Sequence, residues 1–331
     1  MAELDERKNG PVADTGADAP SDAAPGAAPD APPMRAGLVA VIGAPNAGKS
    51  TLVNHLVGAK VTIVTHKVQT TRANIRGVWS GEGADGVASQ IVFVDTPGIF
   101  APKRRLDRAM VRSAWSGARD ADVVMFVVDA ERGLEGDALA ILEDLASVRL
   151  PKVLVLNKID RIAPEALLAL TARANAEVSF AETFMISATR GHGTDRLLDY
   201  LAGALPEHPF FFPDDQVSDL PLKQLAAEIT REKLYLRLHQ ELPYAAHVET
   251  EDWRETKRGI RIEQTIYVVR DSQKGIVLGK GGETAKSIGR AAREELTELL
   301  EKPVHLFLHV KVRPWESDPE RYREMGLEFG R

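Results

Sequence analysis

The sequence predicts an α/β protein of two domains, in which a doubly wound, mostly parallel sheet precedes a smaller α/β unit. Two observations lead to this fold class. From Gly37 to Leu205, short apolar runs alternate with helix-like stretches, as in parallel strands that helices cover on both faces. After Leu205 the alternation stops at a turn-rich stretch, and the elements that follow come in a different order.

Changes in composition along the 331 residues set the expected domain boundaries. Residues 1–35 consist mostly of Ala, Pro, Asp and Gly without apolar periodicity, so we expect a disordered acidic tail that buries too little surface to offset the entropy of ordering it. The other segments are a large domain, a linker with the sequence PEHPFFFPDDQVSDLP, a small domain and a polar C-terminal tail, at residues 36–205, 206–221, 222–315 and 316–331.

Each predicted element follows from a local pattern. Apolar runs of strand length in the large domain stand at residues 38–42, 91–94, 123–128, 153–156 and 184–186. The longer stretches between and after them predict helices at residues 51–57, 106–113, 137–145, 166–173 and 194–205. The small domain is expected to run helix, strand, strand, helix, helix, strand. Five of these six elements are placed at residues 222–240, 246–253, 260–269, 283–300 and 304–312, and the remaining helix precedes a glycine-rich loop that opens the helix at 283–300.

The composition excludes several classes of protein. The chain has no cysteine, which excludes disulfides, thiolate metal sites and cysteine nucleophiles. No apolar run approaches the roughly 18 residues of a membrane span, and the N-terminus lacks the basic-then-apolar order of a secretory signal, so we expect a cytoplasmic protein. The net charge of −6 does not exclude a nucleic-acid partner, because residues 1–33 carry −5 of it and the remaining 298 residues are nearly neutral.

The stretch GAPNAGKS, at Gly43–Ser50, matches the pattern G-x-x-x-x-G-K-[ST] of phosphate-binding loops. It follows an apolar strand and opens a helix, the context in which loop amides and a helix N-terminus converge on phosphates. We expect Lys49 to reach the β- and γ-phosphates of a nucleotide and the hydroxyl of Ser50 to bind Mg²⁺.

The stretch VLVLNKID, at Val153–Asp160, indicates which base is bound. The carboxylate of Asp160 can accept hydrogen bonds from N1–H and the 2-amino group of guanine, whereas adenine has neither donor and would leave the carboxylate unpaired. Lys158 is expected along the face of the purine, and the backbone of Ser187 and Ala188 near the guanine O6. NKID alone could be an ordinary strand-end turn, but its place between a phosphate loop and ISATRG favours base recognition.

Two further stretches predict a magnesium site. VFVDTPG places Asp95 at the end of a strand, where the carboxylate would hold Mg²⁺ through water. VQTTRANIRG supplies a second hydroxyl, for which we favour Thr71 over Thr70. Gly98 is expected to donate its amide to the γ-phosphate and to move when that phosphate leaves.

Together these stretches define the predicted site. The expected catalytic residues are Lys49, Thr71 and Asp95, and the expected Mg²⁺ ligands are Ser50, Thr71 and Asp95. The residues expected to contact the nucleotide are Gly43, Ala44, Pro45, Asn46, Ala47, Gly48, Lys49, Ser50, Thr51, Asp95, Thr96, Pro97, Gly98, Asn157, Lys158, Asp160, Ser187, Ala188 and Thr189.

A second glycine-rich loop, Gly279-Lys280-Gly281-Gly282, lies between helical stretches of the small domain. It lacks the spacing of a phosphate loop but fits the GxxG loop of KH domains, which holds the backbone of about four single-stranded nucleotides. Residues Arg270–Arg293 carry a net charge of +4, which also favours RNA. A turn that only links two helices would have the same GxxG pattern. The expected RNA contacts are Lys274, Ile276, Val277, Gly279, Lys280, Gly281, Gly282, Lys286, Arg290 and Arg293.

The order of motifs resembles the Era family of bacterial GTPases. The motifs are GAPNAGKST, QTTRANI, DTPGIF, NKID and SAT, followed by REKL, ELPY and GKGG, within Leu38–Trp315. The resemblance implies a Mg²⁺-dependent GTPase that binds GTP and GDP, with a type II KH domain that binds the 3′ end of 16S rRNA. It also implies stimulation of hydrolysis by RNA, a role in maturation of the 30S ribosomal subunit, and peripheral association with the inner membrane.

Two positions bear on the rate of hydrolysis. Ile99 follows DTPG and cannot orient a water molecule as glutamine does in Ras-like proteins, so we expect slow intrinsic hydrolysis. Asn46 is the second position, because potassium-dependent relatives use an asparagine there to bind K⁺ beside the phosphates. An equal alternative is that Asn46 only shapes the turn.

A second hypothesis for the function stays open from the sequence. The chain could be a GTPase switch whose main effector is a protein or the inner-membrane surface, linked to cell-cycle control, with the C-terminal domain as a docking module. Whether RNA changes the rate of hydrolysis distinguishes the two hypotheses. No motif requires a dimer, so we expect a monomer.

Overall fold

A computed structural model describes residues 33–67, 70–238, 242, 244–315 and 318–329. The tail predicted to be disordered comprises residues 1–35, of which residues 1–32 lie outside the described part of the chain. At Met34 and Arg35 the prediction is wrong, because these residues pair with Ala88 and Ser89 in the first strand of the sheet. All helices and strands below belong to one unit, Met34–Arg331.

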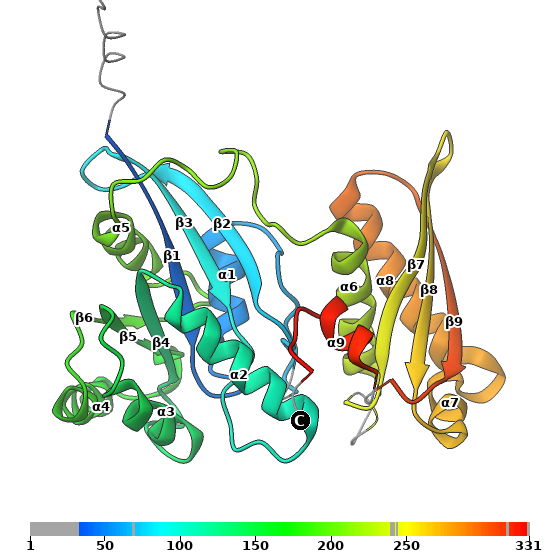
Figure 1. The fold of residues 1–331 in the computed structure, drawn as a ribbon, viewed down its shortest axis with the longest axis horizontal. Coiled ribbons are helices and arrows are strands. Elements are labelled where there is room, and N and C mark those ends of the chain that lie inside the picture. The colour runs from blue at the N-terminus through cyan, green and yellow to red at the C-terminus, as the bar shows by residue number, and fades with distance from the viewer. Residues whose placement is uncertain (1–32, 68–69, 239–241, 243, 316–317, 330–331) are drawn as a thin grey trace, which may run out of the picture. The chain divides into compact units, whose positions relative to one another are not determined.

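The large domain contains the predicted doubly wound sheet. Its elements are β1 (Met34–Ile42), α1 (Lys49–Val57), β2 (Ile75–Glu82), β3 (Ala88–Asp95), α2 (Arg105–Arg119), β4 (Val123–Asp129), α3 (Asp137–Leu145), β5 (Lys152–Asn157), α4 (Pro164–Glu177), β6 (Glu182–Ile186) and α5 (Thr194–Ala204). The strand order is β2-β3-β1-β4-β5-β6, and every pair is parallel except β2 with β3 (Figure 1). The predicted fold class is confirmed.

Two apolar layers hold the helices on the sheet. Alternate strand residues such as Val41 and Phe93 pack against α1 and α5, and the intervening residues such as Ala40 and Phe126 pack against α2, α3 and α4. Strands buried on both faces explain the continuous apolar runs of the sequence. Because the parallel strands end at one edge, the loops after β1, β3, β5 and β6, which carry the predicted motifs, lie together there.

Strand β2 was not predicted. Its sequence, IRGVWSGE, has two glycines and a weak alternation, which argue against a strand. It forms because all eight residues pair antiparallel with β3, from Ile75 with Asp95 to Glu82 with Ala88. Tertiary pairing thus overrides a poor local propensity.

The small domain has the predicted order of elements. They are α6 (Leu222–Arg237), β7 (His247–Thr256), β8 (Gly259–Val268), α7 (Asp271–Leu278), α8 (Glu283–Leu300) and β9 (Val304–Val312). Strand β8 is central, antiparallel to β7 and parallel to β9. Helices α6 and α8 pack on the sheet through buried side chains that include Ile229, Ile262 and Leu296.

The C-terminal segment expected to be a polar tail contains a further helix, α9 (Pro319–Glu324). Tyr322 and Leu327 are buried and pack with Trp315 and with Met110 of α2. None of the helices in the described part of the chain is both long and apolar enough to cross a membrane.

The small domain also buries a histidine. His247 begins β7, and its ring centre lies 5.4 Å from that of Trp315, with the two rings tilted by 34°. Burial, and after it the nearby cations Arg72, Arg321 and Arg231, together lower the pKa of His247 to about 3. The imidazole is therefore neutral in the folded protein throughout the neutral and mildly acidic range.

This burial predicts acid sensitivity of the fold. Between about pH 6.5 and pH 3 the unfolded chain binds a proton at His247 that the folded chain does not, so the free energy of unfolding falls as the pH falls, by up to about 1.4 kcal/mol per pH unit. We expect the free energy of unfolding of His247→Gln to fall less steeply than that of wild type between pH 7 and pH 5. Urea unfolding followed by tryptophan fluorescence measures it. The matched control is His309→Gln, at an exposed position of β9, which should keep the wild-type slope. Equal slopes for all three proteins would contradict the prediction.

Candidate functional site

The phosphate loop joins β1 to α1 and is closed by contacts of its own. Gly48 has φ +95°, and a Cβ there would lie 2.3 Å from Nδ2 of Asn157, so no other residue fits. The Lys49 ammonium donates to the carbonyl oxygens of Gly43 (3.0 Å) and Ala44 (3.1 Å). Burial lowers the pKa of Lys49 to about 8, although the charge of Asp95 offsets part of the effect. The loop thus holds a buried cation where phosphates are expected.

Three hydroxyl groups converge on one carboxylate oxygen at the end of β3. Oδ2 of Asp95 accepts from Ser50 (2.7 Å), Thr62 (3.0 Å) and Thr71 (3.3 Å), and the hydroxyls of Ser50 and Thr71 are 2.9 Å apart. The Asp95 side chain is fully buried, which raises its pKa, while the bond from Ser50 opposes the rise. The structure brings together the three predicted Mg²⁺ ligands.

The chemistry of this cluster fits a hydrated Mg²⁺ ion. All its donors are hard oxygen atoms, which Mg²⁺ prefers. Oδ1 of Asp95 is buried and has no hydrogen-bond partner among the described residues, so a ligand group there would satisfy it. Thr70 is not part of the cluster, because its hydroxyl bonds to Thr65 (2.6 Å) and to the carbonyl of Lys67 (2.7 Å).

Thr62 of this cluster, and Asn54 that supports it, were missed by sequence reasoning. Thr62 is almost fully buried and donates to Asp95 as described above. Asn54 holds the backbone at Thr62, since its Oδ1 accepts from the amides of Val61 and Thr62 and its Nδ2 donates to the carbonyl of Thr62. The signal that could have identified Asn54 is its place four residues after Ser50, on the same face of α1.

The residues predicted to read the base are held by the phosphate loop and by one another. Asn157 donates to the carbonyl of Ala47 (2.9 Å) and accepts from the amide of Ala188 (3.0 Å), so one amide side chain joins three loops. Asp160 accepts from the hydroxyl of Ser187 (2.7 Å), and this bond lowers the pKa of the Asp160 carboxyl. The carboxylate is therefore ionised and fixed in place.

Asp129, at the end of β4, is a third residue that sequence reasoning missed. The Lys158 ammonium lies 2.6 Å from its carboxylate and 2.8 Å from the carbonyl of Asn46. Lys158 has φ +65° and is thereby directed back over the phosphate loop. Asp129 is buried, so its carboxylate has a fixed position. Its ion pair therefore fixes the side chain of Lys158, which is expected along the purine face.

A pocket of about 400 Å³ lies among these loops. The predicted nucleotide contacts that line it are Pro45, Asn46, Gly48, Lys49, Ser50, Thr51, Gly98, Asn157, Lys158, Asp160, Ala188 and Thr189, with Thr71. The other predicted contacts, Gly43, Ala44, Ala47, Asp95, Thr96, Pro97 and Ser187, do not line it. Thr96 is fully buried and donates to the carbonyl of Val41 (2.7 Å), which gives it a role in holding the strand end.

The loop after β3 lies directly against the phosphate loop. A Cβ at Gly98 would lie 2.9 Å from Cα of Pro45, so only glycine allows this approach. The amide of Ile99 donates to the carbonyl of Gly43 (3.1 Å), and its side chain is buried in the core against α2 and α3. Ile99 therefore has no group that could orient a water molecule.

The second glycine-rich loop lies between α7 and α8. Gly281 and Gly282 have φ values of +62° and +83°, and no described atom lies within 4 Å of a Cβ built at either position. Gly279, with φ +72°, has no such space, because its Cβ would lie 2.2 Å from Oγ1 of Thr284. Lys280 is exposed beside them. The loop therefore presents an open backbone and one cation to solvent.

The other predicted RNA contacts lie on the two helices that flank the loop. Lys286, Arg290 and Arg293 are exposed and, at spacings of four and three residues, share one face of α8. Ile276 is 57% exposed on α7, and Lys274 is partly exposed. Val277 is fully buried in the core of the small domain, so its side chain has no surface on which RNA could lie.

These features define the class of protein. A doubly wound sheet with a phosphate loop and the NKID motif, followed by an αββααβ domain with a GxxG loop, is a P-loop GTPase with a C-terminal KH domain. Family models agree: residues 38–158 match a family described as 50S ribosome-binding GTPase, and residues 241–316 match the KH domain.

Relatives identify the family within this class. The GTPase Era of Rhizobium meliloti is 66% identical over 299 residues, which cover 90% of this chain and 94% of the relative. That of Brucella suis is 63% identical over 297 residues, which cover 89% and 94%. The chain belongs to the Era family of GTPases.

Solved structures of the family have the same fold. A variant of Aquifex aeolicus Era bound to GDP and AlF₄⁻ superposes with a TM-score of 0.83 and 38% identity, over 88% of this chain and 99% of that one. Era in complex with MgGDPNP and nucleotides 1506–1542 of 16S ribosomal RNA superposes with a TM-score of 0.82, also at 38% identity, over 88% and 99%.

The ion pair of Asp129 with Lys158 predicts the rate of product release. Asp129→Asn keeps the shape but removes a charged hydrogen bond worth roughly 1.5 kcal/mol, so GDP should leave about tenfold faster. Stopped-flow release of a fluorescent GDP measures this rate. Asp120→Asn makes the same change at the exposed end of α2 and should leave the rate unchanged. A release rate of Asp129→Asn within twofold of wild type would refute the role of Asp129.

Proposed function

We propose that the chain is a GTP-driven switch that binds the 3′ end of 16S rRNA through its KH domain and assists maturation of the 30S subunit. The observation that carries the proposal is the pairing, in one chain, of the Asp160 pocket with an open GxxG loop. A relative of 38% identity holds MgGDPNP and 16S rRNA nucleotides together, which supports ligands of the same kind here.

In this proposal each part of the GTPase site has one role. Asp160, ionised and fixed by Ser187, selects guanine. Lys49 exchanges its loop carbonyls for the β- and γ-phosphates. Ser50, Thr71 and Asp95 hold Mg²⁺, which when bound neutralises charge on the phosphates.

The switch consists of the two segments that meet the γ-phosphate. Thr71 belongs to the segment between α1 and β2, and Gly98 to the loop after β3. Both lie at the pocket, and neither is part of a helix or strand. Loss of the γ-phosphate removes their shared ligand, which releases both segments.

The absence of a water-orienting side chain at Ile99 makes intrinsic hydrolysis slow in this proposal. Asn46 lines the pocket with φ +65°, and a K⁺ ion held by its side chain is a candidate source of the missing positive charge. Equal turnover in K⁺ and Na⁺ buffers would leave Asn46 with a structural role only.

The KH domain holds RNA by its backbone in this proposal. Phosphates approach the amides of Gly281 and Gly282 because neither residue carries a Cβ. Lys280 and the basic row on α8 add charge, which makes binding depend on salt concentration. Action in the cytoplasm as a monomer stays a prediction from the sequence, and attachment to the inner membrane stays a prediction of the family resemblance.

The proposed role of Asp160 predicts that a substitution at this position changes which nucleotide base the protein prefers. Asp160→Asn replaces an acceptor for the 2-amino group of guanine with an amide that can donate to the 2-oxo group of xanthine, so GTP should bind about 10- to 100-fold more weakly and XTP more tightly. Hydrolysis of both nucleotides, measured against concentration, tests this. Asp195→Asn, an exposed aspartate of α5, should keep wild-type preference. An unchanged preference in Asp160→Asn would exclude Asp160 from base recognition.

RNA binding is tested by GTP hydrolysis with and without a short RNA that copies the 3′ end of 16S rRNA. We expect the RNA to accelerate hydrolysis in wild type and to bind Gly281→Asp about tenfold or more weakly, because a carboxylate then faces the phosphates. The left-handed conformation at Gly281 tolerates Asp and Asn better than other residues, so the fold is kept.

Gly281→Asn is the matched control for this experiment. It has the same size and backbone conformation as Gly281→Asp but no charge, so it should retain most of the RNA affinity. Equal loss in both variants would indicate a steric effect instead of phosphate contact. If RNA binds wild type without changing hydrolysis, the KH domain only anchors the chain, and the trigger is a protein or a membrane surface.

A further inference from the structure

The switch segment between α1 and β2, described at residues 58–67 and 70–74, is held by the KH domain on both sides of Thr71. The carbonyl of Thr70 accepts a hydrogen bond from the guanidinium of Arg231 on α6. On the other side, Arg72 donates to Tyr235 Oη, the carbonyl of Ala246 and the carbonyl of Tyr244, each at 3.0 Å. The proposed Mg²⁺ ligand therefore lies between two residues whose positions the second domain determines.

Both arginines are removed from solvent, which makes these contacts obligatory. Arg231 is 1% exposed and Arg72 4% exposed. Arg231 forms an ion pair with Glu228, and the guanidinium of Arg72 lies 5.4 Å from the ring centre of Trp315. A buried guanidinium that lost its acceptors would carry a large desolvation penalty.

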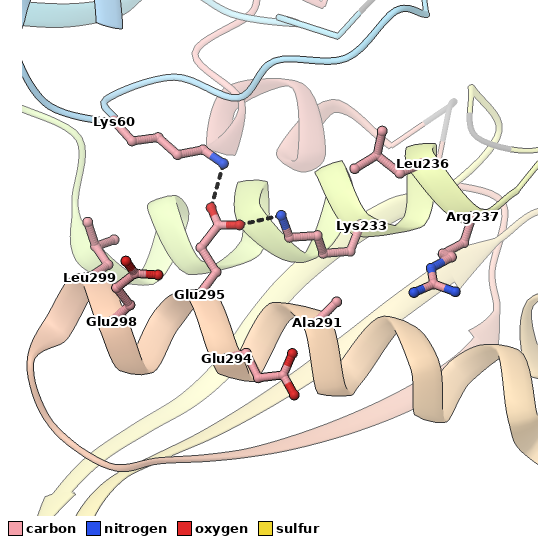
Figure 2. A pocket seen from close by; sticks show the side chains of 9 residues that line it. All are labelled: Lys60, Lys233, Leu236, Arg237, Ala291, Glu294, Glu295, Glu298 and Leu299. Atoms are coloured by element: carbon pink, nitrogen blue, oxygen red, sulfur yellow. Dashed lines mark hydrogen bonds and ion pairs between the residues drawn. The ribbon is translucent and has the colours of Figure 1, made fainter.

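A second contact holds the beginning of the same segment. The carboxylate of Glu232 accepts from the amide of Val64 (2.9 Å) and from the ammonium of Lys60 (2.7 Å). Figure 2 shows Lys60 directed at Glu295 of α8, which also pairs with Lys233 of α6. Lys67 donates to carbonyl oxygens near the end of α6.

These contacts give a role to two sequence motifs of the KH domain that RNA binding does not use. REKL supplies Arg231 and Glu232, and ELPY supplies the carbonyl of Tyr244. None of these residues belongs to the GxxG loop or the basic row of α8. Each of them has a partner in the switch segment.

We propose that Arg231 and Glu232 are positioning residues for GTP hydrolysis: they hold the backbone of the switch segment so that the hydroxyl of Thr71 faces Ser50 and Asp95. The KH domain thus completes the Mg²⁺ site without touching the nucleotide. This inference rests on the proposed role of Thr71 as a Mg²⁺ ligand.

The experiment compares full-length variants in two assays. Single-turnover GTP hydrolysis is measured as a function of Mg²⁺ concentration, and affinity for a fluorescent GDP is measured at saturating Mg²⁺. We expect Arg231→Gln and Glu232→Gln to need about five- to tenfold more Mg²⁺ for half-maximal hydrolysis. GDP affinity should stay within twofold of wild type, because the switch segment is ordered by the γ-phosphate and GDP lacks it.

Two further variants separate positioning from general damage to α6. Arg231→Lys keeps a cationic donor toward Thr70. It should therefore need less Mg²⁺ for half-maximal hydrolysis than Arg231→Gln does. Arg237→Gln is the matched control on the same helix, since Arg237 is exposed and forms no hydrogen bond or ion pair with any described residue. It should behave as wild type in both assays.

Thr71→Ala, measured in parallel, distinguishes failure of the inference from failure of the proposed site. If Thr71→Ala raises the Mg²⁺ requirement and Arg231→Gln and Glu232→Gln do not, positioning by the KH domain is refuted and the site stands. If Thr71→Ala leaves the requirement unchanged, the proposed site is wrong and the inference falls with it. Should Arg231→Gln not fold, Glu232→Gln decides by the same criterion, because it alters the second proposed contact with the switch segment.

Discussion

The buried carboxylate of Asp95 is the group around which the site is organised. A carboxylate without access to water must find donors, and here they come from the first turn of α1 and from two places in the following segment. Each donor needs its own support. Asn54 holds the backbone at Thr62, and the second domain holds the residues beside Thr71. The contacts that satisfy this one carboxylate, and those that support them, therefore reach from the sheet edge to the KH domain.

The parts of this arrangement that could be predicted from the sequence are those formed by residues close together in the chain. The phosphate loop, NKID and the GxxG loop each place their chemistry within a few residues, and the apolar periodicity determines which sheet edge they share. Thr62 and Asp129 could not be predicted, because their partners depend on how separate loops meet after folding. Strand β2 was missed for the same reason, since its pairing with β3 and not its local sequence makes it a strand.

The motifs REKL and ELPY show the same limit over a longer distance. In the sequence they lie in the second domain and indicate only a family resemblance. In the structure their groups bond to residues 60–72, which precede them by more than 150 positions. No periodicity or spacing could connect segments so far apart. Val277 is the converse case, because an apolar residue beside a binding loop can equally belong to the core, and only its full burial decides that it does.

The chemistry of the contact between switch segment and KH domain favours two discrete states over gradual movement. Arg72, Arg231 and His247 share one buried region with Trp315, and a buried polar group that loses its hydrogen-bond partner costs about 1–3 kcal/mol, and more when the group is charged. Coupling between two ligand sites usually needs only about 1–3 kcal/mol. A partly undocked segment would leave a guanidinium without acceptors, so the segment is either docked, with Thr71 at the metal site, or released. A ligand that favours one of these states from either domain then changes the other domain by the same free energy.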